Sequence, residues 1–510
     1  MRRAGIALAI AVVTAAVFAP ALRNGFVWDD DVNLVANAAY RGLGWRQLHW
    51  MLTTATMGHW IPVTWATLGL DYLLWGMNPA GYHLTNLGLH AAGAAVLFFV
   101  ARRLLAAGMA SGGDRLAGAA AAALFFGLHP LRAESVAWVT ERRDVLSGLF
   151  FLLTVLFYLK SAAAAGRPRR AWLAASVGAY ALALASKSIV MTGPLVLLVL
   201  DAWPLRRLAG HGRARVVEKI PYLVFAAAGA AMAFRAVHAR SELVPLAQLP
   251  LAARLAATAY SLGFYLWKTV LPLDLSPLYP MPARPSLLEP RFLLSTLAVL
   301  AITAALWAAR GRWPAGLAAW AAYAILLAPI SGIVHAGPQI VADRYSYLAG
   351  LPWALLVGAG VSAVVDAGAR GALRSAYARL ALAGAAAWLA GLASLTMVQV
   401  QAWRDPESLW SVALDADPAC DFCHMNLGVS LERRGLDAPA IAHFAAALAL
   451  APDSVPARRN LALTLLKTGR RGEAAAHLRL LLTRAPADAG LRHYLELAET
   501  RTLHEPADRH

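Results

Sequence analysis

Residues 84–101 read LTNLGLHAAGAAVLFFVA, a run of 18 positions without a single Asp, Glu, Lys or Arg. A run of about 17–25 such residues is long enough to cross the hydrocarbon core of a bilayer as one α-helix. The whole chain of 510 residues is 59% hydrophobic and 15% charged, and its mean hydropathy is +0.54. This composition predicts an all-α, polytopic membrane protein and excludes a soluble globular domain for most of the chain.

We predict eleven spans in total. The other ten lie at about residues 4–22, 116–128, 145–160, 171–186, 188–203, 220–235, 292–309, 314–334, 348–365 and 380–400. The apolar stretch 254–272 carries Arg254 and Lys268, so we expect that it does not cross fully. Twelve spans, with a cytoplasmic C-terminus, is the alternative. We interpret the first run as an uncleaved anchor, because it is long for the apolar region of a cleaved signal peptide.

Basic residues gather between the predicted spans. Alternate loops hold 19 Lys and Arg against three acids, Asp114, Glu218 and Asp366. This asymmetry is the positive-inside pattern, so we expect those loops and the N-terminus to be cytoplasmic. The net charge of +17 is therefore a topology signal, and we expect no nucleic-acid partner. The loops that alternate with these basic loops should face outward, and one of them contains the acidic triplet Asp29–Asp31.

The composition becomes polar and charged after Ala402, and the sequence repeats. Pro418, Pro452 and Pro486 are 34 residues apart, and AIAHFAAALALAP aligns without gaps with AAAHLRLLLTRAP. A 34-residue period of paired helices is typical of tetratricopeptide repeats. We therefore predict a membrane domain at 1–402 and a short α-solenoid at 403–510, with repeats at 419–452 and 453–486 and a capping helix. Such a solenoid presents a concave face to a protein partner, although it could also only pack on the membrane domain.

Cys420 and Cys423 are the only cysteines of the chain. The sequence CDFCH, residues 420–424, formally matches a haem-attachment pattern. It lies in the first turn of repeat one and has no apparent second axial ligand, so a disulfide or two packed thiols is the preferred interpretation.

The predicted outer loops carry acids at one place and cations at several others. His83 and Asn86 share one helix face with His90 at the start of the second span, where polar groups should face protein or water. The remaining candidates are His129, Glu134, Arg142, Arg143, Asp144, Lys187, Asp343, Arg344 and Tyr345. Transfer of a sugar from a lipid phosphate needs a carboxylate base and cations that hold the phosphate. Helix capping, surface ion pairing and snorkelling are the structural alternatives.

The order of FVWDDD, NPAGYHLTNLGLH, HPLRAESVAWVTERRDVLSGLFFLL, SKS and ADRYSYL, followed by 34-residue repeats, resembles the transmembrane and tetratricopeptide repeat-containing (TMTC) proteins and their bacterial relatives. The resemblance implies a GT-C-type glycosyltransferase. It also implies an O-mannosyltransferase-like activity that moves a monosaccharide from a polyprenyl-phosphate donor to a hydroxyl of a protein acceptor.

The resemblance also implies roles for residues. Asp29 and Asp30 match the acidic pair that carries the catalytic carboxylate. We favour Asp30 as the base, with Asp29 orienting it or binding a metal, and we leave a divalent metal open. The other candidates match later motifs that bind substrate or phosphate. Two positions depart from many relatives: Ser188 stands where they carry Glu, and Ile61 where they carry Arg.

The predicted protein therefore resides in a bacterial inner membrane with its repeats in the periplasm. A non-catalytic membrane scaffold, with the repeats recruiting envelope-assembly proteins, is the second hypothesis. A transporter is a weaker one, because few ionisable residues lie in the middle of the predicted spans.

Overall fold

The computed structural model describes residues 1–109, 115–210, 212–238, 244–282, 285–334 and 337–500. The chain divides into two compact units, which are described separately. The first comprises Met1–Leu275 and Tyr279–Arg404, and the second comprises Ser276–Leu278 and the chain from Asp405 onward. Helices dominate both units, as the apolar runs predicted. The described strands, β1 (Tyr279–Pro280) and β2 (Gln339–Val341), form one short antiparallel pair.

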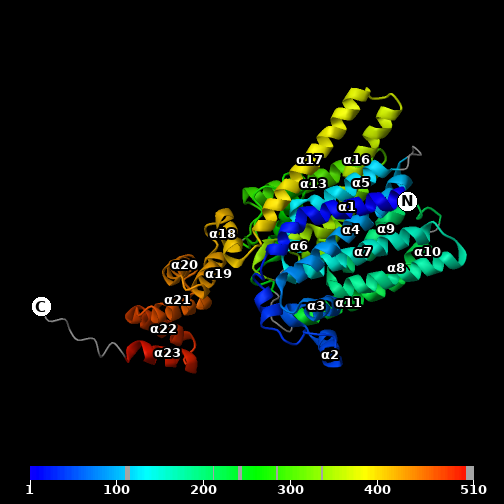
Figure 1. The fold of residues 1–510 in the computed structure, drawn as a ribbon. Coiled ribbons are helices and arrows are strands. Elements are labelled where there is room, and N and C mark those ends of the chain that lie inside the picture. Colours follow the sequence, from blue (N-terminus) through cyan, green and yellow to red (C-terminus); the bar gives the residue numbers. More distant parts are fainter. Residues whose placement is uncertain (110–114, 211, 239–243, 283–284, 335–336, 501–510) are drawn as a thin grey trace. The chain divides into compact units, whose positions relative to one another are not determined.

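The first unit is a helical bundle (Figure 1). Its α-helices are α1 (Arg2–Phe18), α2 (Trp45–Thr53), α3 (Pro62–Trp75), α4 (Pro79–Gly108), α5 (Leu116–Leu128), α6 (Ala133–Ala137), α7 (Arg142–Ala162), α8 (Gly166–Ser186), α9 (Gly193–Ala202), α10 (Gly212–Val217), α11 (Ile220–His238), α12 (Leu251–Val270), α13 (Pro290–Ala308), α14 (Pro314–Leu327), α15 (Ser346–Ala349), α16 (Leu351–Ala369) and α17 (Ser375–Gln401). Short turns of other helix types are η1 (Ala19–Arg23), η2 (Asp31–Val35), η3 (Thr56–Gly58), η4 (Pro130–Arg132), η5 (Val139–Glu141), η6 (Ser188–Thr192), η7 (Ala328–Ile330) and η8 (Asp343–Tyr345).

Within the described residues, seven helices are long and apolar enough to cross a membrane, or eight if a bent pair, Leu116–Leu128 with Pro130–Ala137, is one span. The protein is thus an integral membrane protein. The predicted number of eleven is not reached. Helix α8 begins with arginines at positions 167, 169 and 170. The apolar helices at Ser188–Ala202 and Pro314–Ile330 are shorter than 18 residues. Apolar composition alone therefore overestimated how far these helices continue.

Helix α4 lies at the centre of the bundle and packs against α1, α5 and α7, while α7 packs along α8 (Figure 1). Small residues allow α5 and α16 to cross closely. A Cβ atom on Gly358 would lie 2.5 Å from the carbonyl oxygen of Gly118. Such close backbone contacts are typical of helix association in membranes, where there is no hydrophobic driving force between helices.

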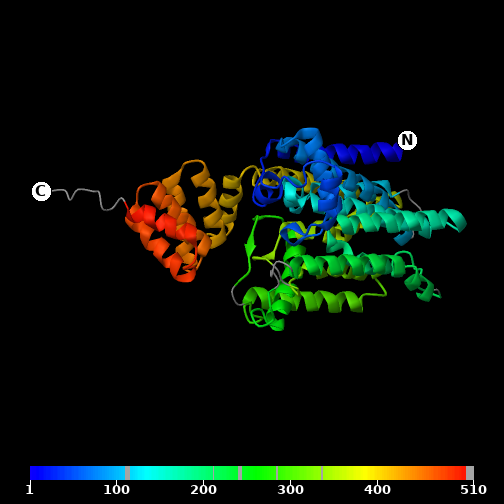
Figure 2. The same cartoon turned by 90° about the horizontal axis from the view of Figure 1, so that it is seen from below.

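The second unit contains six helices among its described residues, drawn in orange to red in Figure 2. They are α18 (Pro406–Ala416), α19 (Asp421–Arg433), α20 (Asp437–Leu450), α21 (Val455–Lys467), α22 (Arg471–Arg484) and α23 (Ala489–Glu499), and each packs against the next along the chain. Helices α19 and α21 begin 34 residues apart, as do α20 and α22. The turn between α19 and α20 contains Gly435, and the turn between α21 and α22 contains Gly469. Their φ angles are positive, 77° and 82°, which glycine adopts without strain.

Cys420 and Cys423 form a disulfide at the start of α19. This pairing selects the disulfide from the two interpretations that the sequence favoured. The thiols are therefore not available for haem attachment. The assignment of the repeats to the tetratricopeptide class stays a prediction.

Candidate active site

The acidic triplet follows a strained turn. Trp28 has φ of 54°, a left-handed conformation that is unusual for a bulky residue and is often found at functional sites. Its ring stacks on Trp138 with centroids 4.8 Å apart. This turn buries Asp30 completely and leaves Asp29 and Asp31 partly exposed. The three consecutive carboxylates therefore occupy different environments.

Both oxygens of the Asp30 carboxylate accept hydrogen bonds. Oδ1 accepts from the backbone N–H of Thr140 at 2.8 Å and from its hydroxyl at 2.6 Å. Oδ2 accepts from the backbone N–H of Val27 at 3.1 Å. Burial raises the pKa of Asp30 to about 7, although these hydrogen bonds oppose the shift. Asp30 thus anchors the first loop to the segment that contains Thr140.

Glu141, the residue after Thr140, is the centre of a buried group of charges. Arg143 donates to both of its carboxylate oxygens, at 3.1 and 2.5 Å. The Lys187 ammonium lies 2.8 Å from Oε2 and Arg344 Nε lies 3.4 Å from Oε1. Asp30 contacts Thr140, and the cations contact Glu141, the next residue of η5. The acidic turn and this group of cations are therefore held by two consecutive residues of the chain.

Two further carboxylates complete the group. Lys187 also pairs with Asp144 at 2.8 Å. Glu134 accepts the backbone N–H of Arg344 at 2.7 Å and forms an ion pair with its guanidinium. We call Glu134, Glu141, Arg143, Asp144, Lys187 and Arg344 the charge cluster. Its three cations balance its three carboxylates, which makes burial of six charged groups energetically feasible.

Arg142 lies outside the charge cluster, although it is adjacent to Arg143 in sequence. Its side chain is fully buried and pairs with Asp71 at 2.6 Å. It also donates to the side chain of Asn86 and, at 2.8 Å, to the carbonyl oxygen of Tyr82. These contacts favour a structural role that joins α3, α4 and α7. Arg142 is thus held by Asp71 and Asn86 rather than by the charge cluster, and its assignment to the phosphate stays a prediction.

The other predicted residues are held by separate contacts. His83 Nε2 lies 3.3 Å from the carbonyl oxygen of Gly25, and His129 Nε2 lies 3.1 Å from that of Thr269. As expected for polar groups on one face of a span, His83, Asn86 and His90 are buried against protein.

Asp343 and Tyr345 lie in η8 beside Arg344. The Tyr279 hydroxyl donates to Asp343 at 3.0 Å, and the Gln339 amide donates to the Tyr345 hydroxyl at 2.8 Å. Burial, and then the nearby Glu134 carboxylate, raise the pKa of Asp343 well above its ordinary value. The hydrogen bonds to Tyr279 and Gln339 link η8 to the β1–β2 pair, and Arg344 links it to the charge cluster.

Three residues absent from the predicted site lie in or beside it. Thr140 holds Asp30, and Asp71 neutralises Arg142. His59 lines a small cleft with Thr140 and Arg143. Desolvation, then the cations Arg143 and Lys187, lower the pKa of His59 well below its ordinary value, so its imidazole is neutral. A lone threonine or histidine in a loop has no distinguishing pattern, so only the tertiary contacts could select them.

No group of three or more His, Cys, Asp or Glu side chains placed to hold a metal ion occurs within the part of the chain that the structure describes.

No protein-family profile matches the chain. Several curated relatives match parts of it, among them the following three. Protein O-mannosyl-transferase Tmtc1 of Drosophila melanogaster is 34% identical over 145 residues, 27% of this chain and 16% of the relative. Tmtc2 of the same organism is 33% identical over 206 residues, 37% of this chain and 20% of the relative. Human TMTC4 is 33% identical over 169 residues, 30% of this chain and 23% of the relative.

This chain is similar to the TMTC protein O-mannosyl-transferases. The resemblance predicted from the sequence motifs is thereby confirmed. The chain spans less than a quarter of the length of these three TMTC relatives. Among solved structures, ArnT from Cupriavidus metallidurans bound to undecaprenyl phosphate aligns with 97% of this chain and 84% of its own, at 19% identity and a TM-score of 0.39. A score of this size does not establish a shared fold or ligand.

Proposed function

We propose that this protein is a membrane glycosyltransferase of the GT-C type. It moves a monosaccharide, by the TMTC resemblance mannose, from a polyprenyl-phosphate donor to a hydroxyl of a protein acceptor. The observation that carries the proposal is the similarity to protein O-mannosyl-transferases. The acidic turn and the charge cluster support it, because they supply a carboxylate and cations within one structural unit.

We assign the general base to Asp29 rather than to Asp30. Both oxygens of Asp30 are occupied by donors from Thr140 and Val27, and its side chain is sealed from solvent. Asp29 is partly exposed on the same strained turn. Asp30 then holds this turn against Thr140 and positions its neighbour. The sequence favoured the opposite assignment, because spacing alone does not distinguish a buried carboxylate from an accessible one.

The proposed reaction is a single displacement. The Asp29 carboxylate takes the proton of the acceptor hydroxyl, whose oxygen forms a bond to the anomeric carbon of the sugar. The bond between that carbon and the phosphate oxygen breaks, and polyprenyl phosphate leaves with the electron pair. A nearby cation offsets the charge that grows on the phosphate.

We assign the phosphate to the cations of the charge cluster. The side chains of Lys187, Arg143 and Arg344 keep 13%, 9% and 8% of their surface accessible, whereas that of Arg142 keeps none. Lys187 is the most accessible of the four and bridges two carboxylates. A phosphate that reaches Lys187 would therefore exchange one anionic partner for another without leaving the ammonium unpaired.

The charge pattern and the C-terminal segment indicate the location of the protein and the kind of partner it binds. We propose a bacterial inner membrane with the N-terminus in the cytoplasm and residues 403–510 in the periplasm. The Cys420–Cys423 disulfide supports this placement, because disulfides persist in oxidising compartments. The paired helices of this segment would recruit the protein acceptor.

The test is transfer of a labelled sugar from a polyprenyl-phosphate donor in membranes that contain the protein. Asp29→Asn should lower transfer by about 100-fold or more, as expected for loss of a general base. Asp30→Asn should lower it less, and Asp31→Asn, the matched control on the same turn, should retain it. Each variant must first insert and fold like the wild type. Full transfer by Asp29→Asn would overturn the assignment of the base.

The same assay separates the enzyme from a membrane scaffold. For a scaffold, deletion of residues 403–510 removes the cellular phenotype, while Asp29→Asn and Asp30→Asn leave it intact. Absence of transfer from every polyprenyl-phosphate sugar tested, together with that pattern, would replace the enzyme hypothesis by the scaffold.

A further inference from the structure

Helix α7 separates the candidate active site from a second polar region. Asp144 and Arg143 lie in its first turn, and Tyr158 lies near its other end. The helix has 21 residues, so at 1.5 Å per residue its ends are roughly 30 Å apart, about the hydrocarbon thickness of a bilayer. Whatever lies around Tyr158 is therefore on the opposite side of the membrane domain from the charge cluster.

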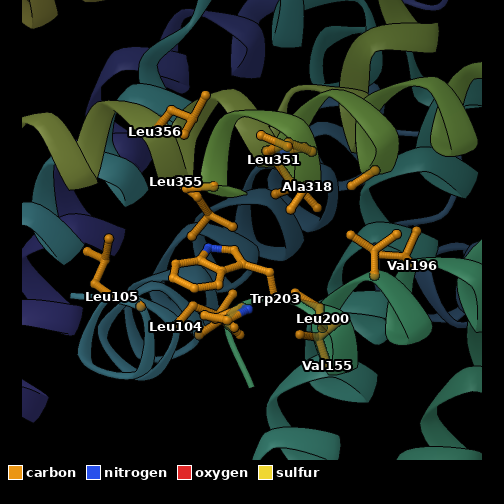
Figure 3. A pocket seen from close by; sticks show the side chains of 18 of the residues that line it. Leu104, Leu105, Val155, Val196, Leu200, Trp203, Ala318, Leu351, Leu355 and Leu356 are labelled. Carbon is orange, nitrogen blue, oxygen red and sulfur yellow. The ribbon is translucent and has the colours of Figure 1, made fainter. Parts of the chain in front are cut away.

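An apolar cavity of about 150 Å³ lies next to this region (Figure 3). It is lined by residues of α4, α7, α9, α14 and α16 and of the segments that follow α4 and α9, and every residue that lines it is apolar or glycine. Representative lining residues are Leu104, Val155, Leu200, Trp203, Ala318 and Leu355. An apolar cavity favours hydrocarbon over water, since its lining offers few hydrogen-bond partners.

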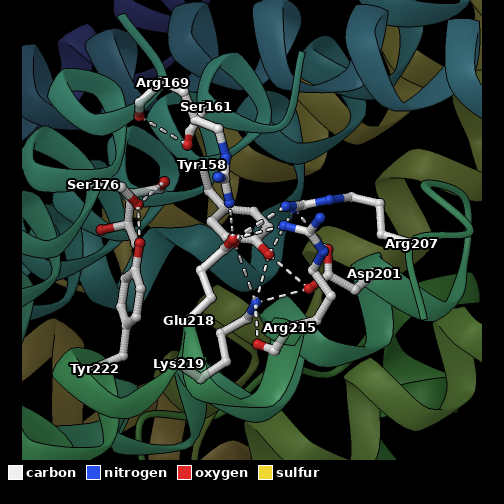
Figure 4. Close-up of polar contacts among 11 residues, drawn as sticks. Tyr158, Ser161, Arg169, Ser176, Asp201, Arg207, Arg215, Glu218, Lys219 and Tyr222 are labelled. Carbon is white, nitrogen blue, oxygen red and sulfur yellow. Dashed lines mark hydrogen bonds and ion pairs between the residues drawn. The ribbon is translucent and has the colours of Figure 1, made fainter. Parts of the chain in front are cut away.

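Residues close in sequence to the cavity lining belong to a network of charges. Leu200 lines the cavity and the next residue, Asp201, belongs to the network; Val155 lines it and Tyr158 is one helical turn further on. Figure 4 shows Lys219 and Arg207 converging on Asp201 and Tyr158. Lys219 Nζ lies 2.7 Å from Asp201, and Arg207 lies 3.0 Å from it.

A second carboxylate holds the rest of the network. Glu218 pairs with Arg169 at 2.5 Å, Arg215 at 2.9 Å and Arg207 at 3.2 Å (Figure 4). We call Asp201, Glu218 and the four cations Arg169, Arg207, Arg215 and Lys219 the basic network. It has four cations against two carboxylates, in contrast to the balanced charge cluster at the other end of α7. Its excess positive charge is complementary to an anion.

Two observations point to cationic groups that an anion could contact. The guanidinium of Arg206 covers the ring of Trp203, 4.6 Å from the centroid, and Trp203 lines the cavity. Arg206 is exposed and adjoins Arg207 in sequence. In addition, Arg215 Nε is a buried donor that has no hydrogen-bond partner among the described residues. The guanidinium of Arg206 therefore lies against a residue that lines the apolar cavity.

We propose that this region binds one anionic glycerophospholipid, with part of an acyl chain in the cavity and its phosphate beside Arg206 and the basic network. The membrane supplies such lipids at high local concentration, and each Lys or Arg near an anionic headgroup contributes to the attraction. The site holds the loop between α9 and α11 against the bilayer. It is independent of sugar transfer, since it lies at the far end of α7.

The experiment uses the full-length protein, purified and delipidated in detergent. Thermal unfolding is followed as dioleoyl-phosphatidylglycerol or dioleoyl-phosphatidylcholine is added, and native mass spectrometry counts the retained lipids. We expect saturable stabilisation by phosphatidylglycerol with one lipid retained, and a weaker effect of phosphatidylcholine. Equal stabilisation by both lipids would overturn the role of the cations.

Two variants locate the site. Ala318→Phe fills the cavity and should abolish the phosphatidylglycerol effect. Arg206→Gln should weaken it about fivefold. The matched control is Arg310→Gln, because Arg310 also covers a tryptophan, 5.1 Å from the centroid of Trp307, but Trp307 does not line this cavity. If Ala318→Phe does not fold, Arg206→Gln decides, since Arg206 is exposed.

A third arm adds an isoprenoid phosphate in place of the phospholipid. If this single-chain lipid displaces phosphatidylglycerol from the wild type and depends on Ala318 in the same way, the assignment to a glycerophospholipid is wrong. Unchanged phosphatidylglycerol binding by both Ala318→Phe and Arg206→Gln would exclude the site itself.

Discussion

The hydroxyl of Thr140 donates a 2.6 Å hydrogen bond to Asp30 Oδ1 across 110 residues of sequence. The backbone N–H of Thr140 donates to the same oxygen at 2.8 Å. Because Glu141 follows Thr140, this contact places the acidic turn beside the charge cluster. Asp30 therefore acts mainly through position, and Asp29 remains the more accessible carboxylate.

The first prediction concerns this contact. Thr140→Val keeps the side-chain shape but removes the hydroxyl, and should lower the free energy of unfolding by about 1.5–3 kcal/mol, as for hydrogen bonds to charged groups. Thr140→Ser keeps the hydroxyl and is the matched control, with a smaller loss. Denaturant titration of the purified protein at about pH 9, where Asp30 is ionised because its pKa is about 7, measures both. If Thr140→Val and Thr140→Ser lose the same amount, the hydroxyl contributes nothing to stability.

The second prediction concerns Lys187, which bridges Glu141 and Asp144 at 2.8 Å each. Lys187→Met leaves buried carboxylates without this cation and should cost about 3–5 kcal/mol of unfolding free energy. Adding Asp144→Asn to Lys187→Met should recover part of the loss, because it removes one of the stranded charges. A double variant that is no more stable than the single one would contradict this account.

Lys160→Met is the control for the second prediction. Lys160 lies on the same helix as Asp144, and its ammonium lies 4.0 Å from the centroid of the Trp172 ring. Both residues are partly exposed, and loss of a cation–π contact that is not desolvated costs about 0.5–1 kcal/mol. A loss for Lys160→Met as large as that for Lys187→Met would mean that neither value reports on the charge cluster.

The third prediction is a dependence on pH. Burial raises the pKa of Asp30 from 3.8 to about 7. Between these values the unfolded chain releases the proton while the folded state keeps it, so the stability of the wild type falls as pH rises. Asn at this position does not titrate. Relative to Asp30→Asn, the wild type should therefore lose on the order of 4 kcal/mol between pH 4 and pH 7.

The unfolding free energies of the wild type and of Asp30→Asn, determined at several pH values, measure this difference. Contributions from groups that titrate equally in the two proteins cancel when one free energy is subtracted from the other. The difference should level off above pH 7. A difference that stays constant from pH 4 to pH 8 would show that folding does not change the pKa of Asp30.

The fourth prediction tests the crossing of α5 and α16. Gly358→Ala places a methyl group 2.5 Å from the carbonyl oxygen of Gly118, which a backbone atom cannot avoid by rotating. The expected loss is about 1–3 kcal/mol, as for overpacked sites. Gly360→Ala, two residues away with no atom within 4 Å of the added methyl, should be neutral or stabilising. Equal effects would show that the helices separate freely at this crossing.

Several features followed from local patterns. Helices α4, α7 and α17 coincide with long apolar runs, and the 34-residue period predicted the paired helices of the second unit together with the glycine that recurs at positions 435 and 469. The segments of the candidate site were also recognisable, because charged residues at the ends of apolar runs are costly and stand out. Apolar runs at 188–203 and 314–334 were misleading in length, since composition does not reveal where 3₁₀ turns interrupt a helix.

The sequence by itself determined that this is a helical membrane protein with a repetitive C-terminal segment and that acids and cations flank its spans, because hydropathy and period are local properties. Only the tertiary structure decided which charges pair. Arg142 and Arg143 are neighbours, yet one neutralises Asp71 and the other Glu141, since successive residues on a helix point in different directions. Likewise, only packing across 110 residues distinguishes Asp30, buried against Thr140, from Asp29 on the same turn.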